Sequence, residues 1–167
     1  MQSSSIKSDG KLPKLAFKMN LPKQSSKELC LGDLILSIPG ISTTAWEATS
    51  GFPPYQFEGS TTLKGRGPIP GCAFAQVPFY GVLTKGVYMP AVKGVEGTFY
   101  PITPQKVRLK GMNTVRSDFG IHFDANVPGS AGCVVLRRQS DWDSFRQLMK
   151  EFERQGIESL SLEVLYS

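Results

Sequence analysis

This chain of 167 residues contains few of the residue types from which metal sites and disulfide scaffolds are built. It has one histidine and three cysteines, Cys30, Cys72 and Cys133. Three widely spaced cysteines do not make a disulfide framework, and the lack of a Cys-x-x-Cys pair argues against a structural zinc site. A single bridge between Cys30 and Cys72, which leaves Cys133 free, is the alternative. Nothing in the sequence requires a metal ion or another cofactor.

The chain also lacks long apolar runs and clusters of basic residues. No run of about eighteen apolar residues occurs, so no membrane-spanning helix is expected. Residues 1–10 lack the apolar core of a secretory signal. The formal net charge of +5 favours polyanions in general, including nucleic acid, anionic membranes and acidic wall polymers. Because no dense Lys/Arg patch interleaved with aromatics is present, nucleic acid is not an expected partner.

Glycine and proline, by contrast, are frequent, with 17 and 12 residues. Many turns favour a β-rich protein, and the length suits one domain with a buried core. Residues 1–28 are rich in Ser, Lys, Pro and Gln and are predicted to be an extended or disordered basic arm. Residues 29–167 are predicted to be a single globular domain. We expect this domain to be mainly β with one amphipathic helix, an α+β protein.

Alternating apolar residues predict short strands through most of this domain. The predicted strands are 34–38, 41–49, 73–77, 80–83, 107–109, 119–123, 134–136 and 159–166. A long loop or hairpin is expected over 86–100. One helix is predicted over 140–155, with Ser140 and Asp143 as its N-terminal cap and Gly156 as its stop. The apolar residues of that helix recur at helical spacing: Trp142, Phe145, Leu148, Met149 and Phe152.

The only histidine lies close in sequence to one of the cysteines. Alternating apolar residues over 119–123 predict a half-buried strand that leaves His122 on the opposite face. Residues 124–129 combine Asp, Asn, Pro and Gly and predict a turn, and residues 134–136 predict a second strand. So short a connection is expected to return Cys133 to the side of His122.

A cysteine beside a histidine is the pair on which many thiol nucleophiles depend. The thiolate is the attacking species, and a neighbouring imidazole favours it by accepting the thiol proton. Gly132 lets the backbone approach a substrate closely, and amide groups over 130–133 can face an oxyanion, where one good donor contributes about 3 kcal/mol. The alternative is a buried structural Cys133 beside a His122 that is satisfied within the core.

Residues 130–134, Ser-Ala-Gly-Cys-Val, resemble the signature of the L,D-transpeptidase catalytic domain family, in which a histidine precedes Ser/Thr-x-Gly-Cys-(Ile/Val). Members of that family cross-link or trim peptidoglycan through a cysteine acyl-enzyme on a β-sandwich or barrel scaffold. The resemblance implies that Cys133 is the nucleophile and that His122 is the base. It also implies that the Cys133 amide contributes to the oxyanion hole.

The resemblance gives supporting roles to the residues before the cysteine. It implies that Ser130 and Ala131 belong to the substrate-binding turn that presents the nucleophile, and that Gly132 supplies a second oxyanion-hole amide. Many family members have histidine at the position of Ala131, glycine at that of Phe123 and arginine at that of Val135. These departures and the short loop are typical of a compact phage- or effector-type relative. The likeness covers roughly residues 45–166, including a Ser-Gly pair and a Gly-Pro-Ile-Pro stretch in its first half.

Arg116 and Asp124 are two further candidate substrate-binding residues, because regular strands would place both on the face of His122. Arg116 is expected to bind a carboxylate of a peptidoglycan stem peptide, since guanidinium and carboxylate form two parallel hydrogen bonds. A surface ion pair is the alternative. Asp124 is expected to orient either His122 or the substrate. The apolar residues of 86–100 either wall a substrate groove or simply pack: Tyr88, Met89, Phe99 and Tyr100.

Two functions fit these observations. The first is a cysteine-dependent peptidoglycan peptidase or L,D-transpeptidase, in which water or an amine of a neighbouring stem peptide resolves a Cys133 thioester. The second is a phage virion or tail subunit, structural or wall-binding, that uses the same fold without catalysis. Without an export signal, we expect delivery to the periplasm or cell wall by virion, lysis or injection machinery, with the basic arm binding other virion or tail proteins. A third interpretation, nucleic-acid binding, depends on charge alone and predicts a steep salt dependence.

Overall fold

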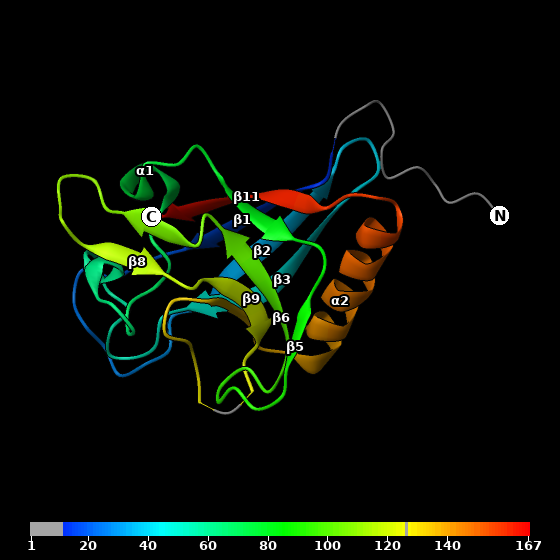
Figure 1. The fold of residues 1–167 in the computed structure, drawn as a ribbon. Coiled ribbons are helices and arrows are strands. Elements are labelled where there is room, and N and C mark those ends of the chain that lie inside the picture. The colour runs from blue at the N-terminus through cyan, green and yellow to red at the C-terminus, as the bar shows by residue number, and fades with distance from the viewer. Residues whose placement is uncertain (1–11, 126) are drawn as a thin grey trace.

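The computed structural model describes residues 12–125 and 127–167, and most of its strands close into a barrel (Figure 1). The elements are β1 Lys14–Met19, β2 Gly32–Ile38, β3 Ser42–Ser50, the 3-10 turn η2 Ser60–Thr62, α1 Cys72–Ala75, β4 Tyr80–Leu83, β5 Val87–Met89, β6 Gly97–Thr103, β7 Lys106–Arg108, β8 Val115–Ser117, β9 Gly120–Phe123, β10 Val134–Leu136, α2 Gln139–Arg154 and β11 Ser159–Tyr166. Around the barrel the order is β4-β11-β1-β2-β3-β10-β9-β6, and pairing of β6 with β4 closes the ring of eight strands. β5 pairs with β6 outside this ring, and β7 and β8 form a separate two-stranded ribbon.

Apolar side chains that alternate along the strands fill the core. In the register of β1, Leu15 lies between Leu36 of β2 and Leu162 of β11, and all three are buried. The long helix α2 packs onto the same core, where the ring of Phe145 meets the ring of Trp46 edge-on at 5.6 Å. The prediction of a mainly β protein with one amphipathic helix is therefore confirmed.

The helix α2 runs beside the barrel (Figure 1) and starts one residue before its predicted range. The predicted cap does not form, because Arg138 is the N-cap residue and makes no side-chain cap hydrogen bond, while Ser140 lies inside the helix. Gly156 adopts a φ of +80° directly after the C-cap residue Gln155, so the predicted stop is confirmed. Within the described residues, no helix has the length and apolar character needed to cross a membrane.

The predicted boundary between a basic arm of residues 1–28 and a domain from residue 29 is wrong. β1 lies inside that range and is a barrel strand, with Leu15, Phe17 and Met19 buried between β2 and β11. Its alternation of apolar and polar residues is a strand signal that the Ser-, Lys- and Pro-rich composition around it obscures. The first part of the predicted arm, residues 1–11, lies outside the described residues.

A second correction concerns residues 73–77, which were predicted to be a strand. Residues 73–75 belong instead to the single-turn helix α1, which begins after Gly71 and is followed by the C-cap residue Gln76 in the left-handed region, with a φ of +58°. Cys72 and Ala75 are the buried residues of this turn. Every other predicted strand is present, with bounds shifted by no more than two residues, and 86–100 contains the β5–β6 hairpin.

Candidate active site

Parallel pairing of β9 with β10 brings the histidine and one cysteine together. Val135 of β10 pairs with His122 of β9, and Cys133 immediately precedes β10. Alternate residues of a strand share a face, so Cys133 and Val135 lie on the face of His122, opposite the buried Ile121. His122 and Cys133 line one cavity of about 420 Å³. The structure thus brings the two side chains to one cavity, as the short connection between them predicts.

A buried serine organises the turn in front of the cysteine. The Ser130 hydroxyl donates to the Cys133 carbonyl at 2.5 Å and accepts from the Gly132 amide at 3.3 Å. Gly132 has a φ of +135°, and a Cβ at this position would lie 2.6 Å from Nη2 of Arg116. Glycine is therefore required both by the backbone conformation and by the neighbouring guanidinium.

The end of β3 fastens this turn to the barrel. The Ser50 hydroxyl donates to the Gly132 carbonyl at 3.2 Å. Gly51 donates its amide to Oγ of Ser130 at 3.3 Å and accepts from the Ser130 amide at 2.8 Å. The Ser-Gly pair picked out in the sequence is thus in direct contact with the turn that carries the cysteine.

Arg116 is buried and does not present a free guanidinium to the solvent. Its Nη1 donates to the carbonyls of Thr61 and Pro68, and its Nη2 donates to the carbonyls of Gly67 at 3.1 Å and Ala131 at 3.4 Å. The alternative of a surface ion pair is therefore wrong, and the donors expected to bind a substrate carboxylate are occupied by backbone carbonyls. Arg116 instead ties the loop over 61–68 to the turn that precedes the cysteine.

The carboxylate of Asp124 is also bound by groups of the chain itself. Its carboxylate is 2% exposed, accepts from Nη1 of Arg137 at 2.7 Å and accepts from the Gly129 amide at 3.0 Å. These contacts close the connection between β9 and the turn over 129–132. The expectation that Asp124 orients substrate is wrong in this geometry, because both of its partners belong to the chain.

The ring of His122 is oriented by a backbone carbonyl. Nδ1 lies 2.8 Å from the carbonyl oxygen of Phe123. Because a carbonyl only accepts, Nδ1 carries the proton of the neutral ring and Nε2 keeps the lone pair. Burial lowers the pKa of His122 from its ordinary 6.5, opposed by the hydrogen bond to Phe123 and by the charge of Asp124. At pH 7 the ring is neutral, with Nε2 as its basic nitrogen.

The sulfur of Cys133 lies at the end of β8. The thiol donates to the Asp118 carbonyl at 3.8 Å, and the Gly120 amide hydrogen-bonds the sulfur. Burial raises the pKa of the Cys133 thiol to about 11, the Gly120 amide lowers it, the charge of Asp118 raises it and that of Arg116 lowers it. At neutral pH the resting pair is therefore a protonated thiol beside a neutral imidazole, so a base has to remove the proton as the sulfur attacks.

The β5–β6 hairpin forms one wall of the cavity. Met89 and Phe99 line it, and Phe99 stacks on His122 with ring centroids 6.0 Å apart. Lys93 lines the same wall and places a cation beside the site. The two tyrosines do not contribute, because Tyr100 is buried against the rings of α2 and Tyr88 is 74% exposed. Both predicted roles for this segment therefore occur: Met89 and Phe99 line the cavity, whereas Tyr100 packs in the core.

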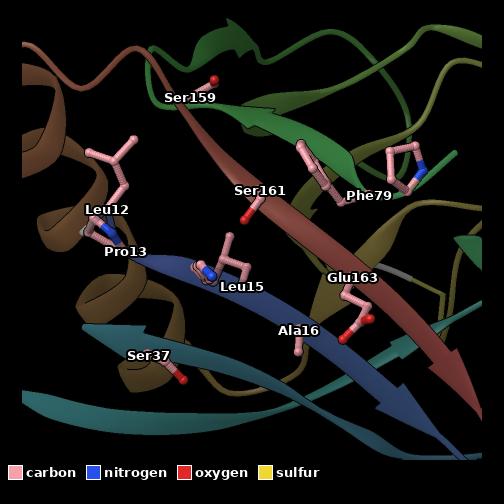
Figure 2. A pocket seen from close by; sticks show the side chains of 11 residues that line it. Leu12, Pro13, Leu15, Ala16, Ser37, Phe79, Ser159, Ser161 and Glu163 are labelled. Carbon is pink, nitrogen blue, oxygen red and sulfur yellow. The ribbon is translucent and has the colours of Figure 1, made fainter. Parts of the chain in front are cut away.

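Two larger cavities lie elsewhere on the barrel. One, of about 620 Å³, covers the outer face of β1 and β11, where Ala16, Ser161 and Glu163 border it (Figure 2). The other, of about 910 Å³, is bordered by Cys72, whose sulfur accepts the Val164 amide at 3.3 Å. The histidine of the chain borders neither. Cavity size alone does not identify the site, whereas the meeting of histidine and cysteine does.

The remaining cysteines have structural environments. All three thiols are free, so the alternative of a Cys30–Cys72 bridge is wrong. Burial raises the pKa of both thiols, and Cys30 donates to the Gln56 carbonyl at 3.6 Å. Among residues 12–125 and 127–167, no three His, Cys, Asp or Glu side chains gather in a way that would hold a metal ion.

Comparisons of the chain with protein-family models, with curated proteins and with solved structures find no match. The geometry of the cavity is therefore the basis for its chemistry. A neutral imidazole whose Nε2 keeps its lone pair and a free thiol border the same cavity, and these are the two groups that general-base-assisted attack by sulfur uses.

Proposed function

We propose that the protein is a cysteine-dependent acyl-transfer enzyme that acts on peptidoglycan stem peptides, in the manner of the L,D-transpeptidases that residues 130–134 resemble. The observation that carries the proposal is the meeting of the sole histidine with Cys133 at one cavity, with Nδ1 of His122 held by the Phe123 carbonyl. A histidine held this way has its tautomer set for accepting a proton through Nε2.

The first half of the reaction transfers the acyl group to the enzyme. Nε2 of His122 accepts the thiol proton while Sγ of Cys133 forms a bond to the carbonyl carbon of the stem peptide. The tetrahedral intermediate then collapses, the carbon–nitrogen bond breaks, and the imidazolium gives its proton to the leaving amine. The result is a thioester on Cys133 and a neutral His122.

In the second half, the acceptor attacks the thioester. His122 removes a proton from water or from an amine of another stem peptide as the new bond forms at the carbonyl carbon. The tetrahedral intermediate then collapses, the carbon–sulfur bond breaks, and the imidazolium returns its proton to the Cys133 thiolate. Water as acceptor gives a peptidase, and an amine gives a transpeptidase. The released product differs between the two cases, so its mass identifies the acceptor.

The negative charge on the intermediate requires a hydrogen-bond donor close to the sulfur. The Gly132 amide already donates to Oγ of Ser130, so we assign Gly132 to the shape of the turn and not to the oxyanion. Within residues 12–125 and 127–167 the Cys133 amide has no hydrogen-bond acceptor, and we assign it as the oxyanion donor. The charge of Arg116 lowers the pKa of the Cys133 thiol and so favours the attacking thiolate.

Turnover of peptidoglycan fragments that carry tetrapeptide stems tests this proposal. The wild-type protein is expected to release the terminal residue or to form cross-linked dimers, both detected by mass spectrometry. Cys133→Ser should reduce either product to background, because a serine hydroxyl is a far weaker nucleophile at neutral pH. Cys30→Ser is the matched control and should retain full activity, since Cys30 is a partly buried thiol outside the cavity. Fragments left unchanged by a folded wild-type protein would overturn the proposed substrate class.

A further inference from the structure

Cys133 borders a second cavity, of about 450 Å³, in addition to the one that it shares with His122. Val115 and Ser117 of β8 line this second cavity, together with Lys64 and Lys106. Because the Asp118 carbonyl, next to the end of β8, accepts from the Cys133 thiol, the strand leads directly to the nucleophile. A ligand lying along β8 therefore reaches the sulfur.

The hydrogen-bonding pattern of the β7–β8 ribbon leaves one edge of β8 open. The Leu109 amide donates to the Thr114 carbonyl, and the Asp118 amide donates to the Gln105 carbonyl. The pairs Leu109–Thr114 and Gln105–Asp118 are therefore hydrogen-bonded pairs of the antiparallel register, in which bonded and non-bonded pairs alternate. Val115 and Ser117 belong to the non-bonded pairs, so their amides and carbonyls are directed away from β7. Within the described residues these backbone groups have no partner.

The charges around the second cavity point to the kind of ligand. Lys64 and Lys106 border it and are exposed, whereas the carboxylate of Asp118 accepts from the Ser117 hydroxyl at 2.9 Å. The guanidinium of Arg116 is already bound by four carbonyls and is not available. The free cations at this cavity are therefore lysines, which suit a ligand that carries a carboxylate.

We propose that the open edge of β8 binds an extended, carboxylate-bearing peptide as an added strand, and that this pairing delivers the peptide carbonyl to Cys133. Main-chain hydrogen bonds to Val115 and Ser117 hold the peptide, and Lys64 and Lys106 bind its carboxylate. The choice of stem peptides as the ligand rests on the proposed function. The strand pairing itself rests on the backbone register and on the position of the cavity.

Binding of a synthetic stem tetrapeptide to the Cys133→Ser protein tests the pairing without turnover. Each amide of the peptide is methylated in turn, and the Kd is measured by calorimetry. Methylation of an amide that faces β8 removes a donor and adds bulk, so the Kd should rise about tenfold at such a position. An amide that faces away should be affected little, because successive amides of a strand point in opposite directions. Equal binding of all the methylated peptides and the parent would overturn the proposal.

A pair of proline variants tests the same edge from the side of the protein. Ser117→Pro removes an amide that faces the cavity and leaves the β7–β8 hydrogen bonds in place. Arg108→Pro is the matched control, because Arg108 pairs with Val115 in the same register and its amide faces the far edge of the ribbon. Ser117→Pro should weaken binding about tenfold and Arg108→Pro should not. If Ser117→Pro does not fold, the methylated peptides decide the outcome.

These measurements separate the two proposals. A position-dependent loss of binding in the Cys133→Ser protein, together with no turnover by the wild type, would retain the strand pairing and overturn the enzyme. Turnover by the wild type with no sensitivity to amide methylation would retain the enzyme and overturn the strand pairing.

Discussion

Replacing His122 by asparagine is expected to lower kcat/KM at pH 7 by about 10²–10⁴-fold, the range typical for loss of a general base. Asparagine keeps a donor for the Phe123 carbonyl, the partner of Nδ1 in the native ring, and removes only the basic nitrogen. The melting temperature should therefore stay close to that of the wild type. Steady-state kinetics on peptidoglycan fragments and a thermal melt of the same preparation measure the two effects.

The pH dependence of this variant distinguishes a base from a structural histidine. Burial lowers the pKa of His122 from its ordinary 6.5 and raises the pKa of Cys133 to about 11, so at pH 7 the wild type pairs a neutral imidazole with a protonated thiol. Wild-type kcat/KM should fall only as the pH drops below 6.5, where the imidazole gains its proton. Without the base, only the preformed thiolate can attack, so the rate of His122→Asn should rise about tenfold per pH unit towards pH 11. A variant profile parallel to that of the wild type would contradict this role for His122.

Replacing Arg116 by methionine is expected to give the largest loss of stability. The substitution leaves the carbonyls of the buried residues Thr61, Gly67 and Pro68, and that of the exposed Ala131, without their charged donor. Hydrogen bonds to charged groups are each worth about 1.5–3 kcal/mol and are not additive, so we expect a loss of ~3–5 kcal/mol in the free energy of unfolding. Urea denaturation with a fixed m-value measures the change.

Two further variants give this prediction its controls. Arg108→Met removes an exposed arginine from the same ribbon and should change stability by less than about 0.5 kcal/mol. Arg116→Lys retains the charge but cannot reach four carbonyls with one ammonium, so it should remain strongly destabilised. Equal stability of Arg116→Met and Arg108→Met would show that the guanidinium does not hold the loop over 61–68 against the turn.

The local parts of the site are readable from the sequence. The alternation over 119–123 predicts that His122 lies on the face opposite Ile121, and the glycine-bearing turn predicts the return of Cys133, because both depend on neighbours within about fifteen residues. The closing strand over 159–166 is also present as predicted. The predicted helix is present too, although its N-terminal cap is not the expected one.

The errors concern the register of neighbouring strands, backbone donors, and contacts between segments far apart in the sequence. Arg116 was expected to bind a substrate carboxylate, with a surface ion pair as the alternative, because its strand alternation says nothing of a loop some fifty residues earlier, whose carbonyls surround its guanidinium. Asp124 was expected to orient substrate because its partner Arg137 follows a second strand whose register is not readable from the sequence. The Gly120 amide, which hydrogen-bonds the Cys133 sulfur, could not be identified from the sequence, because every residue except proline has such an amide.

β1 shows how composition can obscure periodicity. Its six residues bury Leu15, Phe17 and Met19 in the barrel, yet they lie in a stretch whose prolines, lysines and serines are typical of disorder. A short strand gains its stability from the strands on either side, here β2 and β11, and β11 lies almost the whole chain away. Local sequence patterns therefore could not predict the pairing of β1 with β11 in the closed barrel.

The central claim is that Cys133 carries the acyl group, and peptide mapping of the protein during turnover by mass spectrometry tests it most directly. The wild-type protein is mixed with tetrapeptide-containing fragments, quenched in acid and digested at low pH, where thioesters persist. The account predicts an added mass, equal to the acyl part of the stem peptide, on the proteolytic peptide that contains Cys133. The proteolytic peptides that contain Cys30 or Cys72 should carry no added mass. The absence of any adduct while product forms, or an adduct on another cysteine, would contradict it.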